Sequence, residues 1–163
     1  MIKKLLCISV PVAAADQAIK AYIRGQMQGQ TLLEIPGIAA VTPSFNTGAA
    51  FSLLSGQPAF LAAVSALLLL ALCIYAERAL HLSGAAQTAL CLMIGGGVGN
   101  LIDRIVYAGV TDYIRLLLFD FPVFNLADVA ITCSIAALLI LLFTGKLEET
   151  TGEKHGSDHR IDG

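Results

Sequence analysis

The chain has 163 residues, of which 56% are hydrophobic and 13% are charged, and its formal net charge is −2. Soluble domains average about 45–50% apolar and about 25% charged residues, so this composition, with a mean hydropathy of +0.77, indicates a membrane protein. The small net charge, without a segment that is both basic and aromatic, argues against a nucleic-acid partner.

Four apolar segments are long enough to cross a bilayer, whose core of about 30 Å requires roughly 20 apolar residues per helix. Pro11 lies inside the first, where we expect it to bend the helix. The predicted helices span residues of about 5–23, 58–76, 85–106 and 126–143. Together they predict an all-α membrane protein with four transmembrane helices, in one domain covering residues 1–147.

The amino end also fits a second interpretation. Lys3 and Lys4, a short apolar run and three alanines resemble a cleavable secretory signal. The apolar run continues to Ile23, which favours a membrane anchor. Cleavage of this segment as a secretory signal is the alternative.

The connection between the first two helices is unusually apolar. Residues 31–35 and 38–41 are separated by Pro36-Gly37, a pattern that predicts two short strands joined by a turn. Such a segment should lie on the membrane surface or cover a site. The polar segment 148–163 at the other end of the chain should be a disordered cytoplasmic tail.

Basic residues orient the bundle. Arg24 and Arg115 fall on the side of the two longer connections. Six basic residues fall on the opposite side, namely Lys3, Lys4, Arg78, Lys146, Lys154 and Arg160. The positive-inside rule therefore predicts that both termini are cytoplasmic and that the longer connections face outward.

Polar residues inside a membrane are costly and indicate function. Here they concentrate in the outer half of the predicted bundle or just above it. The cluster comprises Asp16, Lys20, Asn100, Asp103, Arg104, Asp112, Asn125 and Asp128. This asymmetry predicts a functional site near the outer leaflet.

Each member also has a structural explanation. Asp16 and Lys20, four residues apart, fit a simple intrahelical ion pair. Asp103 and Arg104 fit ion pairs that join helices, and their adjacent positions direct them to different helix faces. The functional interpretation therefore rests on the cluster as a whole.

The remaining members have equally ordinary alternatives. Asn125 fits a helix N-cap, with Asp128 facing the helix dipole three residues later. Asp112 fits an aspartate in a loop. Gly95 and Gly99 form GxxxG in the third predicted helix, a spacing that we interpret as close helix packing.

Paired aspartates suggest hydrolysis. Two carboxyl groups that share a site hold one proton between them, so that one can activate water while the other polarises a carbonyl. The sequence has neither GxSxG nor HExxH, and its histidines lie away from the cluster. We therefore expect no catalytic triad, no metal and no cofactor. The four cysteines, which lie in apolar runs without CxxC spacing, should be small buried residues.

Five segments of the chain resemble motifs of lipoprotein signal peptidase (signal peptidase II), a family of intramembrane aspartyl proteases. They occur in the family's order from the first to the fourth predicted helix. They are DQAIK at 16–20, FNTGAAFS at 45–52, GGVGNLIDR at 96–104, VTDYI at 110–114 and FNLAD at 124–128. Tyr113 stands where the family often has phenylalanine.

The resemblance implies a fold and a catalytic pair. The family fold is a four-helix bundle with an outer β-cradle and a small periplasmic helix, in the bacterial inner membrane. Asp112 and Asp128 match the catalytic aspartates, and Asp16 and Lys20 match a motif of less certain role. The positions that shape or support the site are Asn46, Gly48, Asn100, Asp103, Arg104 and Asn125.

The resemblance also implies a reaction and its ligands. Family members cleave prolipoproteins just before a diacylglyceryl-modified cysteine, and globomycin-type inhibitors occupy the same site. Two other interpretations compete: an ion or proton transporter, and a structural membrane protein without chemistry. A transporter should carry polar groups into both leaflets, whereas the cytoplasmic half of this bundle has few.

Overall fold

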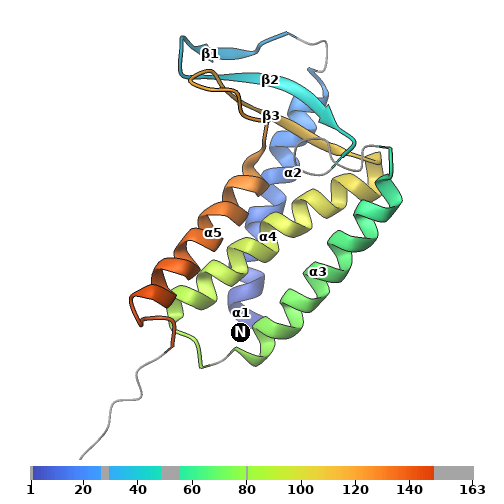
Figure 1. Ribbon diagram of the computed structural model, residues 1–163. Coiled ribbons are helices and arrows are strands. Elements are labelled where there is room, and N and C mark those ends of the chain that lie inside the picture. Colours follow the sequence, from blue (N-terminus) through green and yellow to red (C-terminus); the bar gives the residue numbers. More distant parts are fainter. Residues whose placement is uncertain (1, 27–29, 49–55, 80, 149–163) are drawn as a thin grey trace, which may run out of the picture.

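The computed structural model describes residues 2–26, 30–48, 56–79 and 81–148. Figure 1 shows long helices side by side with a small sheet across one end. The helical elements are α1 (Ile2–Lys4), the π-helical turn η1 (Leu5–Ser9), α2 (Val10–Arg24), α3 (Pro58–Arg78), α4 (Gly84–Tyr107) and α5 (Leu126–Phe143). The strands are β1 (Leu33–Ile35), β2 (Ala39–Asn46) and β3 (Val110–Leu116).

Four helices among the described residues are long and apolar enough to span a membrane, in agreement with the predicted fold class. They are Leu5–Arg24, Pro58–Arg78, Gly84–Tyr107 and Leu126–Phe143. The outward side chains of α3 and α5 are apolar; Leu68 is 67% exposed and Phe143 is 85% exposed. Such surfaces suit lipid as the solvent.

Helix α4 is the centre of the bundle, because it contacts α2, α3 and α5. Its glycines allow these close approaches. A Cβ atom at Gly96 would lie 2.6 Å from the carbonyl oxygen of Ala127 in α5, and one at Gly99 would collide with the carboxylate of Asp16 in α2. These contacts confirm the predicted packing role of Gly99. Gly95 has the same role, because a Cβ atom there would lie 2.8 Å from the carbonyl oxygen of Ser9.

Pro11 lies at the first turn of α2, directly after the π-helical turn η1. A proline lacks the backbone N–H that an α-helix would use, so the change of helical hydrogen bonding before it is the local adjustment.

The expectation that the cysteines are buried was wrong at two positions, since Cys7 and Cys133 are exposed on the bundle surface. In a membrane, such a surface is as apolar as a core.

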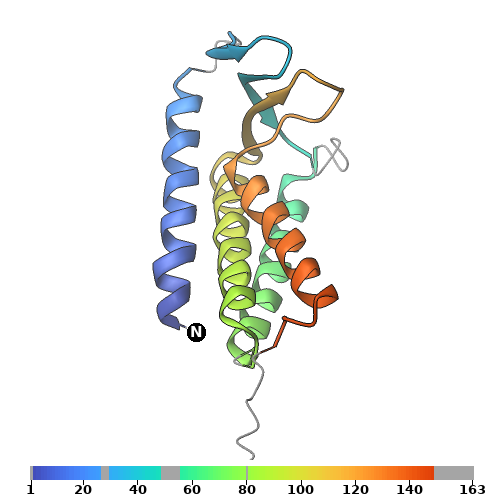
Figure 2. The ribbon, with the colours of Figure 1, turned by 90° about the vertical axis from the view of Figure 1, so that its left-hand side faces the viewer.

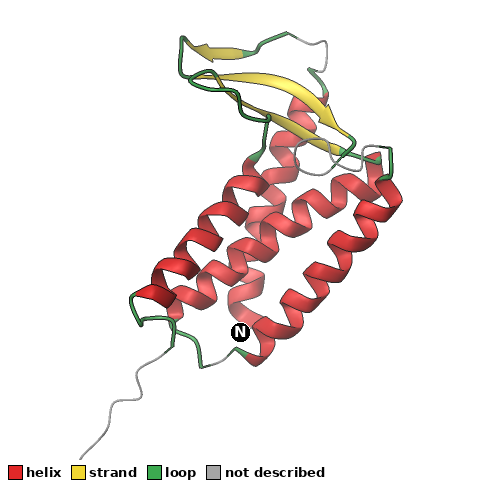
Figure 3. Cartoon of the chain, viewed as in Figure 1, coloured by secondary structure: helices red, strands yellow, loops and turns green. Residues whose placement is uncertain are grey.

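The three strands form an antiparallel sheet in the order β1-β2-β3 (Figure 3). A turn with Gly37 at a φ of 72° joins β1 to β2, which confirms the two predicted strands and their turn. Strand β2 continues to Asn46, five residues beyond the predicted end at Val41, because its second half pairs with β3. Figure 2 shows the sheet beyond one end of the bundle.

Strand β3 was not predicted from the sequence, where Asp112 was expected in a loop. Residues Val110 to Tyr113 are all buried, so both faces of this part of β3 are covered. Its sequence therefore lacks the alternation of apolar and polar residues that predicts a strand with one exposed face. Helix α4 ends before it with Ala108 in the left-handed region, at a φ of 59°. The next residue is Gly109, where a Cβ atom would lie 2.7 Å from the Phe45 ring.

Helix α5 ends at Phe143, and Gly145, two residues further on, has a φ of 67°. The N–H groups of Gly145 and Lys146 donate to the carbonyls of Leu142 and Leu141, which is the Schellman pattern. The tail from residue 149 and part of the second motif, residues 49–55, lie outside the described residues. No short outer helix occurs in the described parts of the outer connections.

Candidate active site

The polar cluster converges where the helix bundle meets the sheet. Asp112 lies on β3 and Asp128 lies in the first turn of α5, and both line one cavity of about 490 Å³. Asn46, Asn100 and Arg104 contribute the other polar groups. Most of the remaining lining is apolar: Val110, Leu116, Phe121, Pro122, Val123, Phe124, Val129, Thr132 and Cys133.

Backbone pairing after β3 brings α5 to this cavity. The N–H groups of Tyr113 and Ile114 donate to the Phe124 carbonyl at 3.0 and 2.8 Å, and the Phe124 N–H donates back to Ile114 at 3.0 Å. In addition, the Tyr113 hydroxyl accepts from the Leu126 N–H at 3.1 Å. Asn125 and Asp128 thus enter α5 beside Asp112, although thirteen or more residues separate them in the chain.

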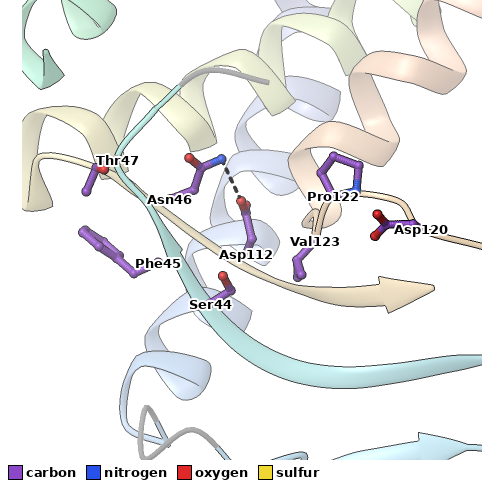
Figure 4. A pocket seen from close by; sticks show the side chains of 8 residues that line it. All are labelled: Ser44, Phe45, Asn46, Thr47, Asp112, Asp120, Pro122 and Val123. Carbon is purple, nitrogen blue, oxygen red and sulfur yellow. Dashed lines mark hydrogen bonds between the residues drawn. The ribbon is translucent and has the colours of Figure 1, made fainter. Parts of the chain in front are cut away.

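Asp112 is 4% exposed and accepts a hydrogen bond on each carboxylate oxygen. The Asn125 amide donates to Oδ1 at 2.7 Å, and the Asn46 amide donates to Oδ2 at 3.3 Å. Figure 4 shows the second bond, which crosses from β2 to β3. The orientation of Asp112 is therefore set from both the helix and the sheet.

Burial and the neighbouring Asp128 charge raise the pKa of Asp112 to about 6. The bonds from Asn125 and Asn46 oppose this rise, because a donated hydrogen bond favours the ionised form. A carboxyl group with such a pKa can hold a proton at mildly acidic pH, as a general acid requires.

Asp128 is held by a capping box at the start of α5. Its N–H donates to the Asn125 Oδ1 at 3.0 Å, and its own Oδ2 accepts from the Asn125 N–H at 3.2 Å. Its Oδ1 accepts from the Asn100 amide at 2.7 Å. The N-cap interpretation of Asn125 is thus correct, and the same side chain also contacts Asp112.

Asp16 and Lys20 form the intrahelical ion pair expected from their spacing, with 2.8 Å between Nζ and Oδ2. Both side chains are fully buried and also reach other helices. Asp16 accepts from the Ala127 N–H of α5 at 3.1 Å, and Lys20 donates to the Asn100 Oδ1 at 2.7 Å. The pair therefore connects α2 with α4 and α5.

Asp103 connects α2, α4 and β3. It accepts from Gln17 at 2.9 Å and from Arg24 at 3.1 Å, and its other oxygen accepts from the Thr111 N–H at 2.9 Å. Arg24 also donates to the Thr111 hydroxyl at 3.2 Å. These bonds fix the residue that directly precedes Asp112, so Asp103 acts on the geometry of β3 without lining the cavity.

Arg104 has a different environment from its neighbour Asp103, as expected for adjacent helical residues. It is partly buried and lines the cavity with Asp112 and Asp128. Its guanidinium is available for a substrate carbonyl or headgroup.

Gly48, also expected in the site, is buried and donates its N–H to the Asn46 Oδ1 at 2.9 Å, which orients the Asn46 amide.

A second cavity of about 420 Å³ lies on the sheet side of Asp112 (Figure 4). Ser44 and Phe45 of β2 and Asp120, Pro122 and Val123 line it together with Asn46, Thr47 and Asp112. Asp120, Gln17 and Thr111 were not predicted from the sequence as site residues. Gln17 and Thr111 stand in the motifs at 16–20 and 110–114 but carry no charge, and Asp120 stands between two motifs.

The described residues contain no group of three His, Cys, Asp or Glu side chains that could hold a metal ion. The charged and amide groups that line the main cavity are two carboxyl groups, two amides and one guanidinium. Such groups can exchange protons with water and polarise a carbonyl.

A bundle of membrane-spanning helices that encloses paired carboxylates defines this protein as a multi-pass membrane protein with a site suited to hydrolysis. The family model described as "Signal peptidase (SPase) II" matches residues 8–144. The chain therefore belongs to the signal peptidase II family, whose members are bacterial membrane proteases that process lipoproteins.

Individual relatives agree. The lipoprotein signal peptidase of Gloeobacter violaceus is 40% identical over 128 residues, which cover 78% of this chain and 74% of the relative. That of Streptococcus pyogenes serotype M1 is 39% identical over 145 residues, which cover 88% of this chain and 95% of the relative.

Solved structures share the fold. A structure titled "Bacterial membrane enzyme structure by the in meso method at 2.3 A resolution" superposes with a TM-score of 0.78 at 31% identity, covering 92% of this chain and 95% of the other. A second with the same wording at 1.9 Å gives a TM-score of 0.74 at 32% identity, covering 87% and 94%.

Proposed function

We propose that this chain is an aspartic endopeptidase that removes the signal peptide from diacylglyceryl-modified prolipoproteins, with Asp112 and Asp128 as the catalytic pair. The observation that carries the proposal is that both carboxyl groups line one cavity and are linked through Asn125 and Asn100. Asn125 donates both to Asp112 and, at 3.1 Å, to the Asn100 oxygen.

In the proposed reaction, a water molecule lies between the two carboxyl groups. Asp128, which lies at a helix N-terminus where negative charge is favoured, takes a proton from this water. The water oxygen attacks the peptide carbonyl while Asp112, the member with the raised pKa, donates its proton to the carbonyl oxygen.

The tetrahedral intermediate then collapses. The peptide C–N bond breaks, the proton on Asp128 moves to the leaving amine, and Asp112 recovers its proton from the intermediate's hydroxyl. Arg104 and the amides of Asn46 and Asn125 are placed to polarise the carbonyl or hold its developing charge. The residues that bind substrate or support the site are, in this proposal, Asn46, Gly48, Asn100, Asp103, Arg104, Asn125, Asp16 and Lys20.

The proposed substrate fits the apolar part of the cavity. Val129, Thr132 and Cys133, which follow Asp128 in α5, line this part, and Thr132 and Cys133 are exposed on the surface of the bundle. A lipid-bearing peptide could therefore reach the carboxyl groups from within the bilayer. We propose that globomycin-type inhibitors occupy the same cavity, and that no metal or cofactor takes part.

The basic residues support an orientation in which the site faces the outer leaflet of a bacterial inner membrane. Lys3, Lys4, Arg78 and Lys146 lie at the end of the bundle opposite the sheet, where the described chain both starts and stops (Figure 1). By the positive-inside rule this end is cytoplasmic, and the sheet and cavity are extracytoplasmic.

The deciding experiment replaces each aspartate of the pair by asparagine. Asp112→Asn and Asp128→Asn should each reduce the turnover of a purified diacylglyceryl prolipoprotein by at least about a thousandfold, because amides cannot exchange the proton. Cleavage is read as a gel shift, with enzyme amounts matched for inserted protein. Asp120→Asn, which alters an exposed aspartate near the site, is the matched control.

A rate near that of the parent enzyme in either inserted variant would show that the pair is wrongly assigned.

If the protein were an ion or proton transporter, the parent chain itself would not cleave the substrate. The structural-protein alternative makes the same prediction, so cleavage by the parent enzyme excludes both.

A further inference from the structure

The Lys20 ammonium is enclosed in the bundle, and its contacts exceed those of an intrahelical ion pair. Its side chain is 0% exposed, and Nζ lies 2.8 Å from the Asp16 carboxylate and 3.8 Å from that of Asp103. Those carboxylates account for its charge. Nζ also donates to the Asn100 Oδ1 at 2.7 Å, a bond that neutralisation does not require.

This bond sets which end of the Asn100 amide faces Asp128. An ammonium can only donate hydrogen bonds, so the amide oxygen of Asn100 must face Lys20. The amide nitrogen then faces Asp128 and donates to its Oδ1 at 2.7 Å. Rotating the amide by half a turn would place an N–H against the ammonium and an oxygen against the carboxylate, and both contacts are repulsive.

A second donor points at the same oxygen. The Asn125 amide donates to the Asn100 Oδ1 at 3.1 Å, and its direction is fixed because its own oxygen accepts from the Asp128 N–H. Lys20 and Asn125 thus hold Asn100 from two sides. Lys20 is the charged donor of the two, and its bond to the Asn100 oxygen is the shorter, at 2.7 Å against 3.1 Å.

We propose that Lys20 is a positioning residue for hydrolysis, which acts by directing the Asn100 amide N–H at the reactive carboxyl group of Asp128. This inference rests on the proposed function, in which Asp128 takes the proton from water. Asp16 has a matching part: it holds the Lys20 ammonium and, through the Ala127 N–H, anchors the turn of α5 that carries Asp128.

The proposal predicts an effect on turnover rather than on substrate binding. Lys20 is fully buried and is not part of the cavity lining, so its loss should leave KM within about twofold. Without Lys20, the oxygen of the Asn100 amide is held by Asn125 alone, so the Asn100 N–H is directed less firmly at Oδ1 of Asp128, while Oδ2 keeps its bond from the Asn125 N–H. We expect Lys20→Met to lower kcat by at least about tenfold.

Removal of one partner of a buried ion pair can prevent folding. Lys20→Met is therefore introduced in two backgrounds: the parent chain, and an Asp16→Asn background, whose new side-chain amide is neutral but can still accept from the Ala127 N–H. In the second background Asp16→Asn alone, which keeps Lys20, is the reference. The fall in kcat should occur in every background that inserts, at matched protein amounts.

A double-mutant cycle distinguishes positioning from a general structural role. If Lys20 acts through Asn100, the Lys20→Met change should lower kcat by less than about twofold once Asn100 has been replaced by alanine. The control is Ser9→Ala, which removes a 2.7 Å bond from Ser9 of η1 to the Cys91 carbonyl of α4. This bond joins the same two membrane-spanning helices, Leu5–Arg24 and Gly84–Tyr107, but lies away from the site. Ser9→Ala should lower the Tm and leave kcat unchanged.

Two results would overturn the proposal: a kcat within twofold of the reference after Lys20→Met, or a full tenfold fall that persists in the Asn100→Ala background. Asp128→Asn is assayed in parallel. If Asp128→Asn is inactive while Lys20→Met turns over normally, the role of Lys20 is wrong and the proposed function stands. If Asp128→Asn is fully active, the proposed function itself fails.

Discussion

Asn125 illustrates how much one side chain can contribute at the residue scale. Its amide oxygen accepts the Asp128 N–H and caps α5, while its amide nitrogen donates to Asp112 and Asn100. An amide carries an acceptor and two donors, so capping and site support do not compete. The same chemistry makes a carboxylate an unsuitable replacement at this position, because it would have no donor for Asp112.

Arg104 tests the division of roles along α4. Arg104→Ala removes the cation of the cavity, so we expect KM to rise by about tenfold while measurable turnover remains, because a charge-assisted hydrogen bond is worth roughly 1.5–3 kcal/mol. The measurement is a Michaelis–Menten series with the diacylglyceryl prolipoprotein. Arg115→Ala, which removes an exposed arginine from β3, is the matched control. An unchanged rate and affinity for the Arg104 variant would remove it from the site.

The raised pKa of Asp112 predicts how the reaction depends on pH. Turnover requires protonated Asp112, so it should decline as the pH rises through the pKa of about 6, and decline again at low pH when both carboxyl groups are protonated. Asn46→Ala removes a hydrogen bond that favours ionised Asp112. The pKa of Asp112 should then rise further, and the alkaline limb should move to higher pH.

The measurement is the pH profile of kcat/KM for the parent enzyme and the Asn46 variant. A limb that moves to lower pH, or does not move, would contradict the assigned acid. The free energy of unfolding should also fall as the pH rises. Because the pKa of Asp112 is raised in the folded state, this group contributes its full stabilisation below its unfolded pKa of about 3.8, and the contribution is lost as the pH rises through about 6.

At the scale of elements, the site depends on how closely α4 approaches its neighbours. Gly96 contacts the backbone of Ala127, one residue before Asp128, whereas a Cβ at Gly97 would meet only the end of the Leu69 side chain. Backbone cannot move aside as a flexible side chain can. Close packing of α4 and α5 therefore contributes to the position of Asp128 as well as to stability.

Two alanine variants test this point. Gly96→Ala should lower stability by roughly 1–3 kcal/mol and reduce turnover, because α5 must shift away from α4. Gly97→Ala should change both by much less, since Leu69 can rotate. The measurements are thermal unfolding in detergent and the cleavage rate. Equal effects of the two substitutions would show that the Gly96 contact is not limiting.

At the scale of the whole molecule, the helices and sheet place all eight polar residues of the cluster at one end of the bundle. Only the charge distribution says which side of the membrane this end faces. In a background without the four native cysteines, a cysteine at position 30 should react with an impermeant reagent added outside intact cells. A cysteine at position 150 should react only after the cells are opened. Outside labelling of position 150 would reverse the topology.

The sequence alone was sufficient for the helices and for the first two strands. Membrane helices are set by local composition, because each must satisfy its own backbone hydrogen bonds and present apolar side chains to lipid. The turn at Pro36-Gly37 is also encoded locally, because glycine readily adopts the positive φ that the turn requires. The resemblance to signal peptidase II, carried by five short motifs, supplied the family and the candidate residues.

Only the tertiary structure showed what joins those residues. Strand β3 was missed because its burial comes from β2 and the bundle rather than from its own pattern, and Asn46 reaches Asp112 only through that pairing. The bonds from Lys20 to Asn100 and from Asp103 to Thr111 link helices and strands that are distant in sequence. Helix formation follows from short-range composition, whereas the direction of a buried hydrogen bond depends on which chain segments the folded protein brings together.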